Sequence, residues 1–207
     1  SSQGYVLEAA GTNMWESRDE FHFAWSKVTG DFILQAMIEF DGPGVDPHRK
    51  VGLMARASLD AGSPHVSVSR HGDGLTSLQF RLAAAGRTAE IRSEVAGPNM
   101  LQLERRGDIW TMSVARFGEV YSTQALTGDV LGPDALVGVF LCSHSPDVIE
   151  RATLRNVRLI RPAPEGFQPY RDYLGSEVEL LDVGSGVRRV VHRVEDSIQA
   201  PNWTLDG

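Results

Sequence analysis

Planar, hydrogen-bonding side chains recur in three short segments that alternate between apolar and polar residues: Arg56, Gln79, Arg81 and His144. Successive side chains of a strand point to opposite faces, so these groups lie opposite the apolar residues of the same segments. Guanidinium, amide and imidazole groups can bridge adjacent hydroxyl groups. The pattern favours a sheet face that binds a polar ligand such as a sugar. The alternative is a solvated sheet face or an interdomain surface.

Other side chains extend this candidate site. His71 and Asp73 lie at the end of a predicted strand, where the rim of a groove would form. Trp15 precedes the first predicted strand and offers an apolar platform for the C–H face of a sugar ring. His22 and His144 are histidines that could serve, with His71, as acid–base groups near neutral pH.

A loop rich in Gly and Pro carries the candidate metal ligands Asp41 and Asp46, together with His48. Carboxylates combined with backbone carbonyls suit Ca²⁺, whereas acids beside Gly and Pro are also ordinary turn formers. A zinc site at His22, His71 and His144 would require three strands to converge. We therefore expect no required cofactor, and leave open a structural Ca²⁺ at Asp41 and Asp46.

The composition limits the partners of this chain. Its 207 residues carry a net charge of −7 and include two lysines, Lys27 and Lys50. Nucleic-acid backbones and anionic membrane surfaces attract clusters of excess Lys and Arg, so we expect neither as a partner. The sequence contains no apolar run of the roughly 20 residues that cross a bilayer, so we expect no membrane insertion.

The single Cys142 lies in an apolar run and excludes an intramolecular disulfide or a multi-cysteine zinc site. The chain begins at Ser1 and shows no signal peptide, which favours a cytoplasmic location unless the N-terminus has been processed. Cysteine use alone does not indicate the compartment.

Strand-like segments follow one another at the spacing typical of β-sandwiches, separated by Gly, Pro and Asp. The middle segments have one apolar and one polar face, and no segment has a helical period, so the sequence predicts an all-β fold with two packed antiparallel sheets. The predicted strands are 20–28, 31–40, 50–58, 65–71, 75–82, 88–93, 100–106, 109–116, 120–123, 136–143 and 149–160.

The composition changes near residue 161. We assign the sandwich to residues 1–160, a Pro-rich connector to 161–175, and a hairpin around Gly184-Ser-Gly186 to 176–207. A lone two-stranded hairpin is marginally stable in water. We therefore expect this hairpin to pack on the sandwich, on a second copy of the chain in a homo-oligomer, or on a propeller domain that is missing here.

Four motifs resemble the concanavalin A-like lectin/glucanase superfamily, especially small bacterial jelly-roll domains of uncharacterised function. They are Gly30-Asp-Phe-Ile-Leu34, Val51-Gly-Leu-Met-Ala-Arg56, Val137-Gly-Val-Phe-Leu-Cys-Ser-His144 and Ala152-Thr-Leu-Arg-Asn-Val157. The resemblance covers roughly residues 4–160 and implies a jelly-roll sandwich with a ligand groove on its concave face. Its motifs specify the fold better than the chemistry.

The tail carries a second resemblance. The hairpin and the segment Gln199-Ala-Pro-Asn-Trp-Thr-Leu-Asp-Gly207 are similar to the opening of a Tol-type β-propeller blade. A propeller needs several blades, and one unit is present here. The resemblance implies a sandwich joined to the start of a propeller; an unrelated hairpin ending in Asp-Gly is the alternative.

Whether the chain is an enzyme is left open. Glycoside hydrolases need two carboxyl groups on one site, and laminarinase-like relatives place them in a Glu-x-Asp-x-x-Glu pattern that this sequence lacks. The resemblance therefore favours a non-catalytic carbohydrate-binding or accessory module that takes a glycan on the concave face. The alternatives are a sugar-active hydrolase or lyase, with or without a metal, and a structural or protein-interaction domain of a larger propeller protein.

Overall fold

The computed structural model describes residues 4–163, 166–168 and 171–198. The chain divides into two units, with the boundary between Arg161 and Pro162. Every regular element in the described residues is a β-strand. Among these residues there is accordingly no helix long and apolar enough to span a membrane.

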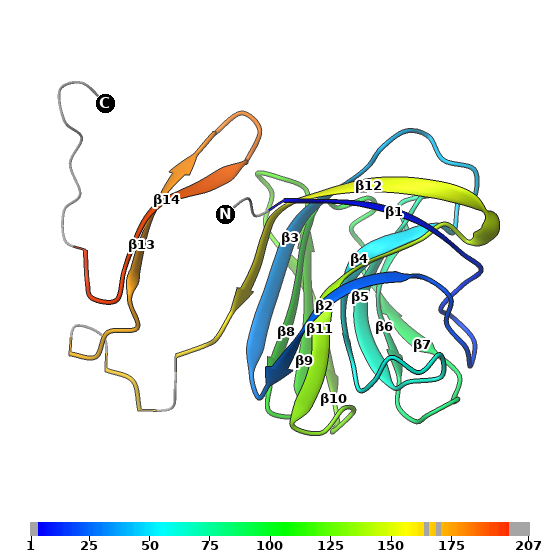
Figure 1. The fold of residues 1–207 in the computed structure, drawn as a ribbon, viewed down its shortest axis with the longest axis horizontal. Coiled ribbons are helices and arrows are strands. Elements are labelled where there is room, and N and C mark those ends of the chain that lie inside the picture. The colour runs from blue at the N-terminus through cyan, green and yellow to red at the C-terminus, as the bar shows by residue number, and fades with distance from the viewer. Residues whose placement is uncertain (1–3, 164–165, 169–170, 199–207) are drawn as a thin grey trace. The chain divides into compact units, whose positions relative to one another are not determined.

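The first unit is a sandwich of two six-stranded antiparallel sheets (Figure 1). One sheet contains, in spatial order, β1 (Tyr5–Gly11), β12 (Ser145–Ile160), β3 (Phe32–Phe40), β8 (Met100–Arg106), β9 (Ile109–Ala115) and β10 (Ser122–Thr127). The other contains β2 (His22–Thr29), β11 (Asp134–Cys142), β4 (Lys50–Arg56), β5 (His65–His71), β6 (Thr76–Arg81) and β7 (Ala89–Arg92). The predicted all-β, two-sheet antiparallel jelly-roll sandwich is confirmed.

Two differences from the predicted strands have simple causes. Strand β1 was not predicted, because its small residues Ala9 and Gly11 give little β-propensity, although Leu7 and Ala9 are buried. Strand β10 lies at Ser122–Thr127 rather than 120–123, since its register is set by pairing with β9 rather than by an apolar alternation of its own.

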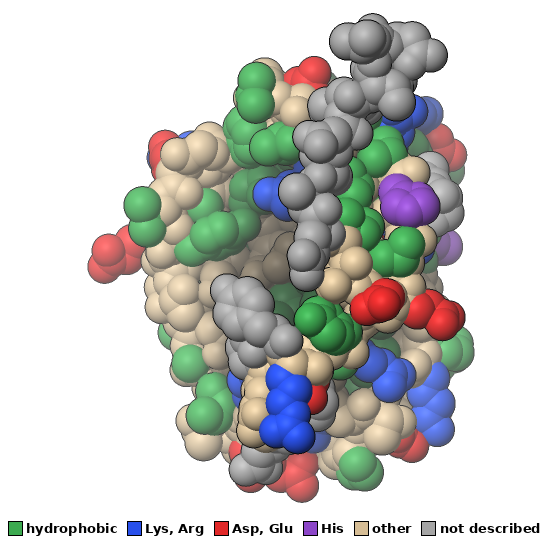
Figure 2. Space-filling view, turned by 90° about the vertical axis from the view of Figure 1, so that its left-hand side faces the viewer, with side chains coloured by type: hydrophobic (Ala, Val, Ile, Leu, Met, Phe, Trp, Pro, Cys, Tyr) green, Lys and Arg blue, Asp and Glu red, His purple; other side chains and the backbone are tan. Residues whose placement is uncertain are grey.

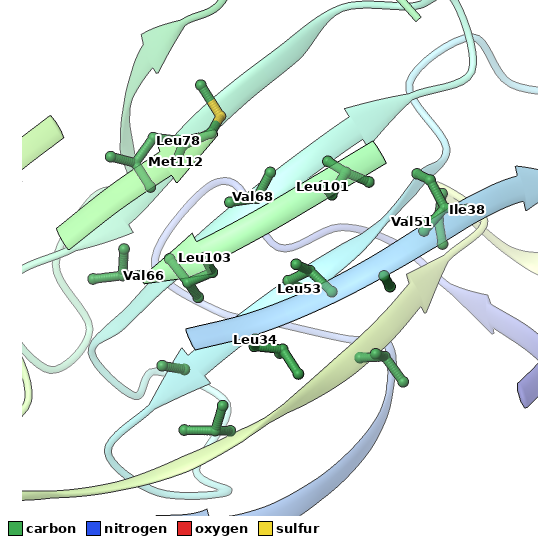
Figure 3. Packing of buried hydrophobic residues seen from close by; sticks show 14 of the residues in the cluster. Leu34, Ile38, Val51, Leu53, Val66, Val68, Leu78, Leu101, Leu103 and Met112 are labelled. Atoms are coloured by element: carbon green, nitrogen blue, oxygen red, sulfur yellow. The ribbon is translucent and has the colours of Figure 1, made fainter. Parts of the chain in front are cut away.

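The core lies between the sheets and is made by the inward faces of their strands. Figure 3 shows Leu34 and Ile38 of β3 near Val51 and Leu53 of β4, with Leu101 of β8 beside them. These five side chains are at most 3% exposed. Fully burying an aliphatic side chain of this size contributes about 1.5–3 kcal/mol, so this layer holds the second sheet in a fixed orientation on the first.

Two glycines let the strands of the second sheet approach closely. A Cβ atom at Gly138 of β11 would lie 1.9 Å from the carbonyl oxygen of Ala24 in β2. A Cβ atom at Gly52 of β4 would lie 1.9 Å from the carbonyl oxygen of Val68 in β5. Any side chain at these positions would therefore push neighbouring backbones apart.

The second unit contains the hairpin of β13 (Ser176–Leu181) and β14 (Arg188–Val194), which confirms the predicted C-terminal extension. Its turn is closed by the Asp182 carboxylate, whose Oδ1 accepts hydrogen bonds from the backbone N–H and hydroxyl of Ser185. The propeller-like segment 199–207 lies outside the described residues, and the division at residues 160 and 175 stays a prediction. On the face shown in Figure 2, the coloured basic side chains lie among acidic and apolar ones.

Candidate functional site

The outward face of the second sheet, which points away from the core, carries polar side chains arranged in rows across the strands. Because residues paired across strands share a face, Arg56, His65 and Arg81 form one row, and Lys50 and His71 form another at the opposite end of the strands. Residues 12–19, between β1 and β2, cover part of this surface: the backbone N–H of Asp19 donates to Ala61, and that of Thr88 donates to Trp15. The covering segment divides the surface into a buried end and a hollowed end.

The buried end is a network of two arginines around one carboxylate. Asp19 accepts hydrogen bonds from Arg56 at 3.1 Å and from both terminal nitrogens of Arg81 at 2.9 and 2.6 Å. Arg81 also donates to the backbone carbonyls of Glu16 and Ser63. Burial raises the pKa of Asp19, while the hydrogen bonds and positive charges of Arg81 and Arg56 oppose that rise.

This network changes the role expected for two predicted ligand-binding residues. Arg56 and Arg81 are 3% and 0% exposed and have their donors on Asp19 and on backbone carbonyls. Their side chains fasten residues 12–19 to the sheet instead of facing an open groove. The sequence pattern placed them on the correct face, but it could not show that a distant carboxylate would cover them.

A small apolar cluster adjoins the network. Met14, Met54, Phe140 and Cys142 are fully buried, with Phe21 and Phe23 packed against them. Phe21 meets Phe140 edge to face, with ring centroids 5.9 Å apart. Two contacts thus anchor the covering segment to the sheet. Met14 packs in the apolar cluster, and Asp19 forms ion pairs with Arg56 and Arg81.

The hollowed end is a pocket of about 310 Å³. Side chains from the covering segment, the 41–49 loop, the strands β4, β5 and β7 and the β11–β12 turn converge on it. Its lining is Asn13, Trp15, His48, Lys50, His71, Leu75, Glu90, Arg92 and His144. Three predicted residues, Trp15, His71 and His144, are therefore brought together in one place.

His71 forms part of the pocket wall, and its ring is hydrogen-bonded to Gln79, another residue predicted for the site. Gln79, fully buried behind it, places its side-chain Nε2 3.2 Å from His71 Nε2 and 3.2 Å from Ser77 Oγ. An amide nitrogen can only donate, so His71 Nε2 accepts and the ring is neutral. Burial, reinforced by the positive charge of Lys50, lowers the pKa of His71 to about 4.

Two further imidazoles form the rim of the pocket. The ring centroid of His48 lies 5.8 Å from that of His71 and 5.6 Å from that of His144. Nδ1 of His144 is 3.3 Å from the carboxylate of Asp46. His144 has a φ of 64°, a left-handed conformation that is uncommon outside glycine and that turns its ring toward the pocket at the β11–β12 connection.

The part of the pocket lining that comes from β7 carries an ion pair. Arg92 Nε lies 2.5 Å from Glu90 Oε1, and Ser77 Oγ donates to the other carboxylate oxygen at 2.9 Å. Burial acts to raise the pKa of Glu90, but the hydrogen bonds from Arg92 and Ser77 outweigh it and lower the pKa. Glu90 is therefore ionised, and the guanidinium group of Arg92 balances its charge.

Two predicted residues lie apart from the pocket lining. His22 is paired with Leu141, a core residue, and so lies on the opposite face of the second sheet, where it is exposed. Asp73 is exposed beyond the end of β5, and its carboxylate accepts from the backbone N–H of Leu75 in a tight turn. Asp73 thus shapes the rim near Leu75 without lining the pocket.

The predicted calcium ligands Asp41 and Asp46 both contact protein side chains. Asp41 accepts hydrogen bonds from Arg151 and Thr153, and Asp46 pairs with His144. Across the described ranges, no group of three or more His, Cys, Asp or Glu side chains is placed to hold a metal ion. The three histidines of the candidate zinc site do not converge, because His22 lies on the other face of the sheet from His71 and His144. A structural Ca²⁺ at Asp41 and Asp46 stays a prediction.

Sequence reasoning missed Asn13, His48, Lys50, Glu90 and Arg92 as lining residues. Lys50 could have been found, because it has the same strand parity as Arg56 and so points to the polar face. Glu90 and Arg92 likewise share a parity on β7. Asn13 and His48 lie in irregular segments, where no periodicity indicates direction.

The comparisons with known proteins identify the fold. No family model matches the chain, and no curated protein matches its sequence. Among solved structures, a functionally unknown protein from Saccharomyces cerevisiae is 18% identical, with a TM-score of 0.59 over 78% of this chain and 90% of its own.

Two further similar structures are, by their names, a carbohydrate-binding module and a lectin. The carbohydrate-binding module CBM66 from Bacillus subtilis is 14% identical, with a TM-score of 0.50 over 76% of this chain and 95% of its own. Lectin I-B4 from Griffonia simplicifolia, in its metal-free form, is 12% identical, with a TM-score of 0.50 over 77% of this chain and 91% of its own. The chain thus has the concanavalin A-like jelly-roll fold found in lectins and carbohydrate-binding modules.

Proposed function

We propose that this chain is a carbohydrate-recognition module that binds a glycan in the pocket on the outward face of the second sheet. The observation that carries the proposal is the convergence of Trp15, Asn13, His71 and His144 on one pocket of about 310 Å³. An aromatic ring beside planar donors and acceptors matches the alternating apolar and hydroxyl surfaces of a sugar. The presence of the same fold in a carbohydrate-binding module and a lectin supports this proposal.

The expected affinity is modest. Each neutral hydrogen bond exchanges with water and contributes about 0.5–1.5 kcal/mol net. The pocket offers one indole ring, Trp15, rather than a row of aromatic platforms. We therefore expect binding to depend on several polar contacts, with dissociation constants that calorimetry can measure at high ligand concentration.

Isothermal titration calorimetry of the full chain against a panel of oligosaccharides tests the proposal. Trp15→Ala should weaken binding of a bound sugar about tenfold, because it removes the apolar platform. Trp25→Ala is the matched control, since Trp25 is 45% exposed on β2 and does not line this pocket. Equal losses in both variants, or a panel without any binding sugar, would refute glycan recognition in this pocket.

A sugar-active enzyme is the second candidate, and the cluster of His48, His71 and His144 favours it. A neutral imidazole beside a bound sugar can accept a proton in hydrolysis or elimination. Incubating the same panel with the chain and with His144→Ala, followed by chromatography of the products, tests this candidate. Products that form with the unaltered chain but not with His144→Ala would favour the enzyme. Sugars that all remain intact would favour the binding module.

A further inference from the structure

Lys50 is a buried cation in the lining of the pocket. Its residue is 2% exposed, and its ammonium group donates one hydrogen bond, to Asn13 Oδ1 at 2.9 Å. An ammonium group has three donors, so this contact leaves others to be satisfied. Among the described residues, no carboxylate forms an ion pair with it. Burying an unpaired charge is costly, so such a cation calls for a counter-ion.

Two of the nearby acidic groups already have side-chain partners of their own. Glu90 is paired with Arg92 and bonded to Ser77, and Asp46 is paired with His144. The neighbouring Cys142 is a neutral thiol, because burial raises its pKa. Burial also lowers the pKa of Lys50, while the carboxylates of Asp46, Glu90 and Asp73 act in the opposite direction without forming an ion pair with it. A ligand anion in the pocket is therefore the group that could pair directly with the ammonium group of Lys50.

Asn13 fixes the position of this cation. Its Oδ1 accepts from Lys50 Nζ and also from the backbone N–H of Met14, at 2.8 Å. Met14 is itself fully buried in the apolar cluster beneath the covering segment. The ammonium group is thus preorganised at the pocket wall, and an anion binding there would need little rearrangement.

We propose that the ligand of this pocket is an acidic saccharide, whose carboxylate or sulfate group pairs with the ammonium group of Lys50. This inference rests on the proposed function, because it names the class of sugar that the same pocket takes. His71 and Asn13 line the wall beside Lys50 and would contact the neighbouring hydroxyl groups. A charge-assisted contact is stronger than a neutral one, so charge selects the ligand.

The test compares matched acidic and neutral sugars. Calorimetry of the full chain would use oligomers of galacturonate, glucuronate and mannuronate, each beside its methyl ester, and a sulfated galactose oligomer beside its unsulfated form. We expect at least one acid to bind about ten- to hundredfold more tightly than its neutral partner. The preference should decrease as salt rises, because ions screen the charge.

Two variants and a control assign the preference to Lys50. Lys50→Met should remove the difference between acid and ester, and Asn13→Asp should weaken acid binding by supplying an internal counter-ion. Lys27→Met is the control, since Lys27 is exposed and pairs with Asp134. Circular dichroism confirms that each variant is folded, and the salt series on the unaltered chain gives an answer that needs no variant.

The outcomes separate the two proposals. Preference for a uronate supports a carboxylate ligand, and preference for the sulfated oligomer alone supports a sulfate ligand. Equal affinity for every acid and its neutral partner overturns the acidic-saccharide inference and leaves glycan recognition intact. Binding of none of these sugars, acidic or neutral, overturns both.

Discussion

At the residue scale, Asp19 shows that a charged side chain can be structural within a predicted binding face. It lies between Arg56 and Arg81, and all three side chains are at most 3% exposed. The electrostatic attraction within such a network offsets the desolvation free energy of the buried charges only while every partner is present. Asp19 therefore determines whether residues 12–19 stay on the sheet.

Replacing Asp19 tests that role. Asp19→Asn should lower the free energy of unfolding by about 3–5 kcal/mol, because it leaves two buried guanidinium groups without a counter-charge. Urea denaturation followed by tryptophan fluorescence measures the change. Glu16→Gln removes an exposed ion pair with Arg87 and should cost less than about 1 kcal/mol. Similar losses in the two variants would contradict a structural role for the buried network.

His65, in the same row, predicts a pH dependence of stability. Burial and the charges of Arg81 and Arg56 lower its pKa to about 3. The unfolded chain binds a proton near pH 6.5 and the folded chain does not, so stability falls as the pH is lowered from 6.5 toward 3. His71, with its pKa lowered to about 4, adds to this loss in the same direction.

Urea unfolding at pH 7.5, 5.5 and 4.5 measures this effect. His65→Gln should reduce the loss of stability between pH 7.5 and 4.5 by an amount on the order of a few kcal/mol, because it removes one of the two linked protonations. His22→Gln is the matched control, since His22 is an exposed histidine of the same sheet. A parallel pH profile for His65→Gln and the unaltered chain would show that His65 is not buried in its neutral form.

The same residues show what a sequence can predict about a site. Strand alternation placed Arg56, Gln79 and Arg81 on the polar face of the second sheet, as the pairing of β4, β5 and β6 confirms. Alternation carries no information about a carboxylate 62 positions away, and Arg81 and Asp19 are separated by that distance. The polar face was therefore predictable, whereas its division into a salt-bridged end and a pocket was not.

At the element scale, the irregular segment 12–19 completes the site that the strands begin. Strands β4, β5 and β6 supply Lys50, His71 and the buried Gln79, and the covering segment supplies Asn13 and Trp15. Such a segment has no period, so its course follows from tertiary contacts alone. Its apolar anchor is Met14, which is fully buried with Met54, Phe140 and Cys142.

Shortening that anchor should loosen the segment. Met14→Ala removes a buried side chain and should lower the free energy of unfolding by about 2–5 kcal/mol. It should also speed the reaction of Cys142 with a thiol reagent, because this free cysteine is fully buried in the intact cluster.

A methionine on the other sheet provides the control for this variant. Met37 is half-buried on β3, so Met37→Ala should leave the reactivity of Cys142 unchanged. The reagent's absorbance change gives the rate in each protein. Cys142 reacting equally slowly in Met14→Ala and in the unaltered chain would show that the segment does not depend on Met14.

At the scale of the whole molecule, the main apolar core of the described residues lies within the sandwich. The buried core residues of the main cluster extend from Leu7 to Leu154, all before the boundary at Arg161. In the hairpin, Leu181, Val183 and Val191 are 48%, 82% and 43% exposed. The hairpin thus has cross-strand pairing but no comparable apolar layer within its own described residues.

This contrast predicts that the two units differ in their ability to fold alone. A chain that ends at Arg161 should unfold at the same urea concentration as the full chain and give the same calorimetric response to the sugar panel, because the core and the pocket proposed to bind sugar are complete. A peptide of residues 171–207 should give the circular dichroism of an unfolded chain, since an isolated two-stranded hairpin is marginally stable in water. A shortened chain that is less stable by more than about 1 kcal/mol would show that the tail contributes to the sandwich. Equal stability would show that the sandwich folds without any contribution from the tail.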